Sequence, residues 1–108
     1  MTQFLVIYKA AASAAPEAPE DQQAAMAAWG AWMEKVGTHL ADPGNPIGKS
    51  WTVTASGAAP GGNALPIMGY TILEADSIEA ACQLVEGNPM LSDPLAEIEV
   101  APIVPIEM

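Results

Sequence analysis

Residues 67–90 read IMGYTILEADSIEAACQLVEGNPM, and this stretch decides the fold. Its first part, residues 67–74, is rich in β-branched and aromatic residues, which predicts a strand. Asp76 followed by Glu79 is typical of a capping box at a helix start, and Gly87 is typical of a helix end. The expected apolar stripe of that helix contains Ile78, Ala81, Val85 and an inert, buried Cys82.

Outward from this stretch, the sequence predicts one further helix and three further strands. Residues 3–8 (QFLVIY) predict a strand buried on both faces, and residues 95–101 predict a last strand. Residues 50–56 alternate apolar and polar side chains, and we expect this strand to form a hairpin with the strand at 67–74. Residues 19–37 predict a helix whose buried side carries Met26, Trp29, Met33 and Val36, with Trp32 off that side.

The order β, α, β, β, α, β predicts the α+β, ferredoxin-like arrangement, a four-stranded antiparallel sheet with two helices on one face. A length of 108 residues fits one domain, residues 1–108, and excludes a two-domain enzyme. Residues 10–19, mainly Ala, Ser, Pro and Glu, predict a mobile connection. No predicted element covers the second sheet face, so we expect a homodimer packed face to face.

The charge balance narrows the choice of partners. Thirteen acidic residues against three basic ones give a net charge of -10, and all three cations are lysines. A nucleic-acid or membrane partner is therefore not expected, because a polyanion would be repelled. The single cysteine excludes an intramolecular disulfide, and no leader precedes the first strand, so a cytoplasmic location is expected.

Four features carry a resemblance to a known family. They are FLVIYK (4–9), the predicted helix with the paired tryptophans Trp29 and Trp32, MGYTILEADSIEAACQLVEGNPML (68–91) and AEIEVAPI (96–103). Together they resemble the YCII-related proteins, small domains of mostly unassigned activity. The resemblance implies a dimeric α/β barrel. It also implies that a His and Asp pair could form a catalytic or ligand-binding site, as proposed for some members.

His39 and Asp42 are the candidate catalytic residues. A histidine that titrates near neutral pH beside a carboxylate can act as a general base. The alternative is that His39 is a partly exposed loop residue and that Asp42, before Pro43, stabilises a turn. Trp51, Tyr70 and Met68 are the candidate ligand-binding residues, because large apolar side chains line small-molecule pockets. Trp51 and Tyr70 could equally pack a dimer interface.

Three functions remain open from the sequence. The first is a small-molecule binding protein with a pocket between helix, sheet and dimer mate. The second is a non-catalytic interaction module that uses the sheet face for assembly. The third is a weak acid–base enzyme that uses His39 and Asp42. No cofactor or metal is expected, because Glu97 and Glu99 alone are a weak metal signal and no phosphate-binding loop is present.

Overall fold

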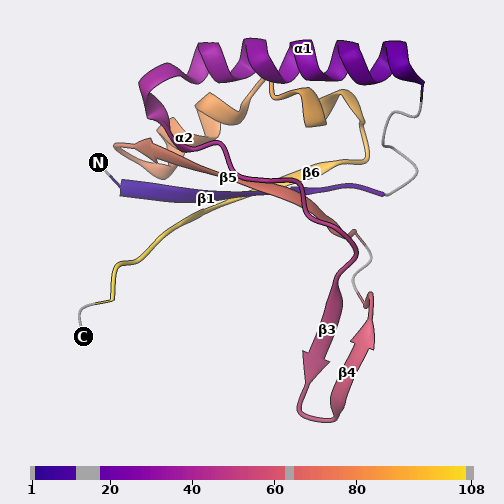
Figure 1. Cartoon of the computed structure of the whole chain (residues 1–108). Helices are drawn as coiled ribbons and strands as arrows, with labels where there is room; N and C mark the ends of the chain where they lie inside the picture. The colour runs from indigo at the N-terminus through magenta and orange to yellow at the C-terminus, as the bar shows by residue number, and fades with distance from the viewer. Residues whose placement is uncertain (1, 12–17, 63–64, 107–108) are drawn as a thin grey trace.

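The computed structural model describes residues 2–11, 18–62 and 65–106 (Figure 1). Most of the connection expected at residues 10–19, and part of the loop expected between the strands at 50–56 and 67–74, lie outside the described residues. In chain order the elements are β1 (Thr2–Lys9), α1 (Pro19–Val36), η2 (Gly37–His39), β2 (Leu40–Asp42), β3 (Trp51–Thr54), β4 (Gly57–Pro60), β5 (Ile67–Ala75), α2 (Ile78–Val85), η3 (Pro89–Ser92) and β6 (Glu97–Pro102).

The main sheet is antiparallel, with the strand order β2-β5-β1-β6. Strand β1 is central and pairs with β5 on one side and β6 on the other. Helices α1 and α2 both lie over the same face of this sheet (Figure 1). The expected α+β class and four-stranded antiparallel sheet are confirmed, and the topology is compatible with a ferredoxin-like fold.

The strand expected at residues 50–56 forms, but in a different sheet. β3 pairs with β4 across a tight turn, and this hairpin projects away from the main sheet (Figure 1). The prediction that it pairs with the strand at 67–74 is wrong. β5 pairs instead with β2, where Leu40 lies opposite Leu73. The residues of β4, GAAP, are poor strand formers, which is why the sequence pattern predicted a loop there.

A close backbone approach explains why the edge of β5 is occupied. Residues 43–47 continue from β2 along β5, and Ile47 N donates a hydrogen bond to Met68 O at 2.9 Å. Gly44 has a φ of +78°, and a Cβ at this position would clash with the carbonyl oxygen of Tyr70. Because only glycine accepts both constraints, this irregular segment takes the place that the predicted hairpin partner would have had.

The core lies between the helices and the side of the sheet that faces them. Alternate residues of β1 and β5 point to this side, as expected for strands with a period of two. The main cluster of buried side chains consists of Val6, Tyr8, Trp32, Val36, Leu73 and Val85.

Trp32 is the principal anchor of α1, which corrects the predicted buried side of the helix. Its side chain is 3% exposed, and Nε1 donates a hydrogen bond to Leu84 O at 2.9 Å. Met26, expected on the buried side, is 74% exposed. The contacting side of the helix is therefore set by Trp32 and Val36, both in its C-terminal half.

Helix α2 begins one residue later than the capping-box pattern indicated. Ser77 is the N-cap, and its hydroxyl accepts a hydrogen bond from Ala80 N at 3.1 Å. Ala81 and Val85 are buried, whereas Cys82 is exposed. The prediction of a buried Cys82 is wrong, because the buried side of this short helix passes through Ala81 and Val85 and leaves Cys82 facing solvent.

The opposite face of the sheet carries half-buried apolar side chains that none of the helices described above covers. Leu5 and Ile7 of β1 and Ile72 of β5 lie on this open face. The β3–β4 hairpin and the chain after β6 extend below the sheet at its two ends (Figure 1). Across β1 and β6, Lys9 Nζ lies 3.1 Å from Glu99 Oε2.

Candidate functional site

A cavity of about 820 Å³ lies between the N-terminal half of α1 and the sheet. Its roof is formed by alanines of α1, and its floor includes Tyr8, Gly69 and Thr71. The segment 43–46 and the segment around η3 form its sides. The size fits a small organic molecule, since ligand pockets are commonly of this order.

Side-chain size explains why the cavity exists. The residues of α1 that face it include Ala24, Ala25 and Ala28, whose single methyl groups do not fill the space beneath the helix. One turn further on, Trp29 and Trp32 fill the corresponding space. On the floor, Gly69 allows the segment 43–46 to approach β5 closely, because a Cβ there would lie 3.2 Å from Asn45 O. The space of the cavity is therefore produced by the small residues of its roof.

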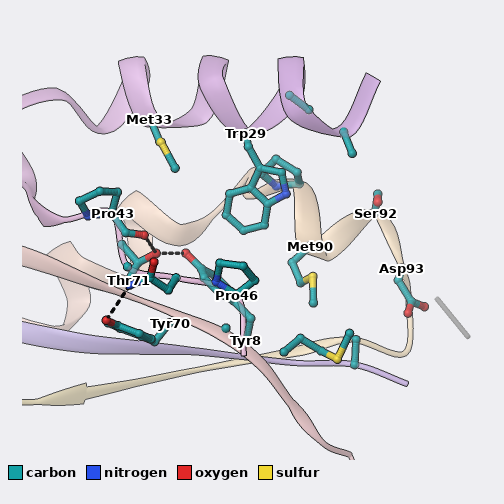
Figure 2. A pocket seen from close by; sticks show the side chains of 18 of the residues that line it. Tyr8, Trp29, Met33, Pro43, Pro46, Tyr70, Thr71, Met90, Ser92 and Asp93 are labelled. Carbon is teal, nitrogen blue, oxygen red and sulfur yellow. Dashed lines mark hydrogen bonds between the residues drawn. The ribbon is translucent and has the colours of Figure 1, made fainter. Parts of the chain in front are cut away.

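Two aromatic rings form a rigid wall at the centre of the cavity. Trp29 meets Tyr8 edge to face, with ring centroids 5.1 Å apart and an interplanar angle of 80°. Trp29 also meets Trp32, at 5.9 Å and 85°. Figure 2 shows Trp29 hanging from α1 above Tyr8, with Met90 of η3 beside it. These contacts fix the ring of Trp29 and give the cavity a preformed aromatic surface.

A hydrogen-bond relay lies at the buried end of the cavity. Thr71 Oγ1 donates to Pro43 O at 3.1 Å, and it lies 2.7 Å from Tyr8 Oη (Figure 2). Because the hydroxyl hydrogen of Thr71 is used on the carbonyl, Tyr8 must donate to Thr71. Both hydroxyl hydrogens are therefore engaged, and the oxygens keep only acceptor capacity toward a ligand.

The environment of Tyr8 keeps its hydroxyl protonated. Burial raises the pKa of this phenol above its ordinary value of 10.0, while the side chains of Thr71 and Asn88 act in the opposite direction. Asn88 is 2% exposed, and its side-chain oxygen accepts a hydrogen bond from Met90 N at 2.9 Å. Its Nδ2 has no hydrogen-bond partner among the described residues. Asn88 lies outside the described cavity lining, and its side chain stabilises the start of η3.

His39 and Asp42 lie outside the cavity lining, at separate anchor points. His39 Nδ1 lies 2.8 Å from Glu74 O, so Nδ1 carries the hydrogen and donates to that carbonyl. Asp42 Oδ1 accepts a hydrogen bond from Gly44 N at 2.8 Å, which is a turn-stabilising contact. Within the described part of the chain no hydrogen bond joins the two side chains, and their catalytic role stays a prediction.

The three expected ligand-binding residues are divided between two places. Met68 and Tyr70 contribute to the cavity lining, and Tyr70 Oη accepts a hydrogen bond from Asn45 Nδ2 at 3.2 Å. Trp51 lies on the projecting hairpin, is 65% exposed and is not part of that lining. The expected neighbourhood of Trp51 and Tyr70 on adjacent strands is therefore not formed within one chain.

Sequence reasoning missed the residues at the centre of the cavity. Tyr8 and Thr71 were placed on buried strands, but the pairing of their hydroxyls needs the register in which β1 and β5 align. The available signal was two hydroxyl groups within otherwise apolar strands, since buried hydroxyls require partners. Trp29 was assigned to the core, where it packs, but it also borders the cavity.

Two carboxylates, Asp21 and Asp93, border the cavity, and no lysine or histidine occurs in its described lining. Among the described residues, no group of three or more His, Cys, Asp and Glu side chains could hold a metal ion.

Comparison of the sequence with known protein families and with curated proteins found no match. No helix in the described ranges is long and apolar enough to cross a lipid bilayer.

Proposed function

We propose that this protein binds a small, largely apolar molecule in the cavity beneath α1. The observation that carries the proposal is the combination of about 820 Å³ of space with a fixed aromatic wall and a buried hydroxyl relay. An apolar pocket with a few placed polar groups is the usual form of a small-molecule site. The aromatic wall would supply contact area, and the relay would orient the ligand.

Binding is better supported than catalysis. The lining described above contains no histidine, cysteine or lysine, and the Tyr8 hydroxyl is held in its protonated form. The acid–base alternative has less support, because His39 and Asp42 are each engaged with the backbone away from the cavity. The YCII resemblance and the cytoplasmic location stay predictions.

The direct test is a fragment screen by ligand-observed NMR, repeated on two matched variants. Ala28→Phe places a ring in the cavity, whereas Ala27→Phe places the same ring on the exposed side of the same helix. We expect fragments to bind the wild type and Ala27→Phe, and to lose binding to Ala28→Phe. Equal binding to all three proteins would contradict the proposed site.

We also propose that the protein is a homodimer that covers the open face of the sheet. Leu5, Ile7 and Ile72 form an apolar strip on that face. The two segments that extend below the sheet also carry exposed apolar side chains, since Val53 is 76% exposed and Val104 is 74% exposed. Exposed apolar side chains on and beside one face are typical of an interface. The interaction-module alternative uses the same surface with a different partner.

Absolute mass by light scattering after size exclusion tests the dimer. We expect the mass of two chains for the wild type and of one chain for Ile7→Lys, because a charge would be buried at the interface. Leu95→Lys, at a side chain that is 78% exposed in the turn before β6, serves as the control. A monomeric wild type would contradict the dimer but not the cavity, which is described within one chain.

A further inference from the structure

The polar groups of the cavity differ in chemical type from one end to the other. Figure 2 shows Pro43 and Thr71 at one end, Trp29 and Met90 in the middle, and Asp93 at the other end. Helix α1 begins above the connection that leads into β6 (Figure 1), which contains Asp93, and Asp21 is in the first turn of α1. A ligand along this axis meets hydrogen-bond acceptors, then an apolar surface, then carboxylates.

The charge of the lining is of one sign. Asp21 and Asp93 are its charged groups among the described residues, and none of the lysines takes part. Lys9 pairs with Glu99 on the open face, and Lys35 Nζ donates to Glu86 O at 3.1 Å near the other end of α1. With a net charge of -10 for the whole chain, the cavity disfavours an anionic ligand and favours a cationic one.

The N-terminus of α1 does not reverse this preference. A helix N-terminus can bind anions through its free N–H groups and positive dipole end. Here Pro19 is the first helical residue and has no N–H to offer, and the carboxylates of Glu20 and Asp21 already lie in the first turn. These two charges offset the positive end of the helix dipole and would repel an approaching anion.

The relay at the opposite end also selects a ligand that donates hydrogen bonds. Both hydroxyl hydrogens of the Tyr8–Thr71 pair are directed along the relay to Pro43 O, so the oxygens can only accept. Ser92, beside Asp93, can either donate or accept and does not change the preference. Between the ends, the faces of Trp29 and Tyr8 suit a cation as well as an apolar body.

Resting on the proposed function, we infer that the cavity takes small organic amines in their protonated form, in preference to carboxylates of the same shape. The ammonium group lies near Asp21 or Asp93, and the apolar body lies against Trp29. A second hydrogen-bond donor, where the ligand has one, reaches the Tyr8–Thr71 pair.

Three matched probes test this inference: 2-phenylethylamine, 2-phenylethanol and phenylacetate, with dissociation constants measured by protein-observed NMR at neutral pH. We expect the amine to bind about tenfold more tightly than the carboxylate, with the alcohol between them. In the double variant Asp21→Asn, Asp93→Asn, the amine is expected to lose its advantage over the alcohol, while the alcohol binds as in the wild type. Asparagine at position 93 keeps the Oδ1 acceptor that Leu95 N uses at 3.0 Å.

A charge-matched control separates the local effect from the net charge. Glu34→Gln, Glu97→Gln removes the same two charges at exposed positions outside the cavity, and the amine preference is expected to remain. Equal or tighter binding of phenylacetate, loss of the preference in this control, or absence of binding by all three probes would each overturn the amine inference. Fragments that remain sensitive to Ala28→Phe would, in those cases, still support the proposed function.

Discussion

The two halves of helix α1 differ in what lies beneath them. Residues 29–36 place Trp32 and Val36 in the core, where they are 3% and 1% exposed. Residues 19–28 belong to the same continuous helix, but they present alanines to the sheet and leave a cavity. Both halves belong to one regular helix, and the small side chains of residues 19–28 leave space where larger side chains of residues 29–36 pack. A helix can thus be anchored at one end and form a roof at the other.

The largest predicted effect tests the anchored half. Trp32→Ala should lower the free energy of unfolding by about 3–5 kcal/mol, because it removes a buried ring and leaves a cavity. It also leaves Leu84 O without its hydrogen bond. Met26→Ala, in the other half, should change stability by less than about 0.5 kcal/mol, because the side chain is exposed. Chemical denaturation measures both values, and similar losses would contradict the division of α1 into two functional halves.

A smaller effect is expected at the boundary between the halves, where Tyr8 lies under Trp29. Tyr8→Phe should lower stability by about 1–2 kcal/mol, because a buried hydrogen bond to Thr71 is lost. The pKa of Tyr8 is raised in the folded protein, so the unfolded chain loses this proton first as pH rises. The contribution of protonated Tyr8 to the free energy of unfolding is therefore complete below pH 10.0, the ordinary pKa of the phenol. It is lost as the pH rises through the pKa of Tyr8 in the folded protein.

Chemical denaturation at a series of alkaline pH values tests whether the contribution of Tyr8 to stability falls as the pH rises. The stability difference between the wild type and Tyr8→Phe should be constant up to about pH 9 and shrink above pH 10, where the unfolded phenol ionises. Tyr70→Phe serves as the control, since its hydroxyl accepts a hydrogen bond from Asn45 at an exposed position. A difference that grew with pH would contradict the assigned burial of Tyr8.

Gly30 gives a smaller effect of the opposite sign. It lies just after the boundary within α1, and a Cβ there would meet nothing within 4 Å. Gly30→Ala should therefore stabilise the protein by about 0.5–1 kcal/mol, through helix propensity and a less flexible unfolded chain. Gly44→Ala should instead destabilise it, because the new Cβ would clash with Tyr70 and the backbone has a positive φ. Thermal unfolding of both variants tests this difference, with a higher melting temperature expected for Gly30→Ala and a lower one for Gly44→Ala.

The smallest effect on stability is expected at the cavity roof. Ala28→Leu should change the free energy of unfolding by less than about 0.5 kcal/mol, because space is available beneath it. Ala81→Leu, where the alanine is 0% exposed, should destabilise by about 1–3 kcal/mol through overpacking. A large loss at Ala28 would show that the roof of the cavity is already well packed.

The sequence predicts the class of fold because each main element has a local signal. The apolar run of β1, the breaker at Gly37 and the pattern of β5 and α2 place these elements within a few residues. The second strand was misassigned because β2 has only three residues and its pairing depends on Gly44 approaching β5. Such a tertiary contact has no periodic pattern in the sequence.

The candidate site could be predicted only in part, for a related reason. Met68 and Tyr70 were named because large apolar side chains on a strand mark a candidate lining, and both border the cavity; their role in binding stays a prediction. The Tyr8–Thr71 pair depends on strand register across 63 residues of chain. The alanines of α1 contribute to the cavity because their small side chains leave space beneath the helix. From the sequence, alanine predicts only that a helix forms, not that a cavity lies beneath it.

The projecting β3–β4 hairpin has a consequence for self-association. Among the described residues, each of its two strands pairs on one side only, and an unpaired strand edge can recruit another chain into a growing sheet. The composition of β4 limits this hazard, because Gly57, Ala58 and Ala59 favour extended pairing weakly and Pro60 has no N–H to donate. Replacing these small residues with valine or isoleucine would strengthen the hairpin and at the same time make its outer edge a template for fibrous aggregation.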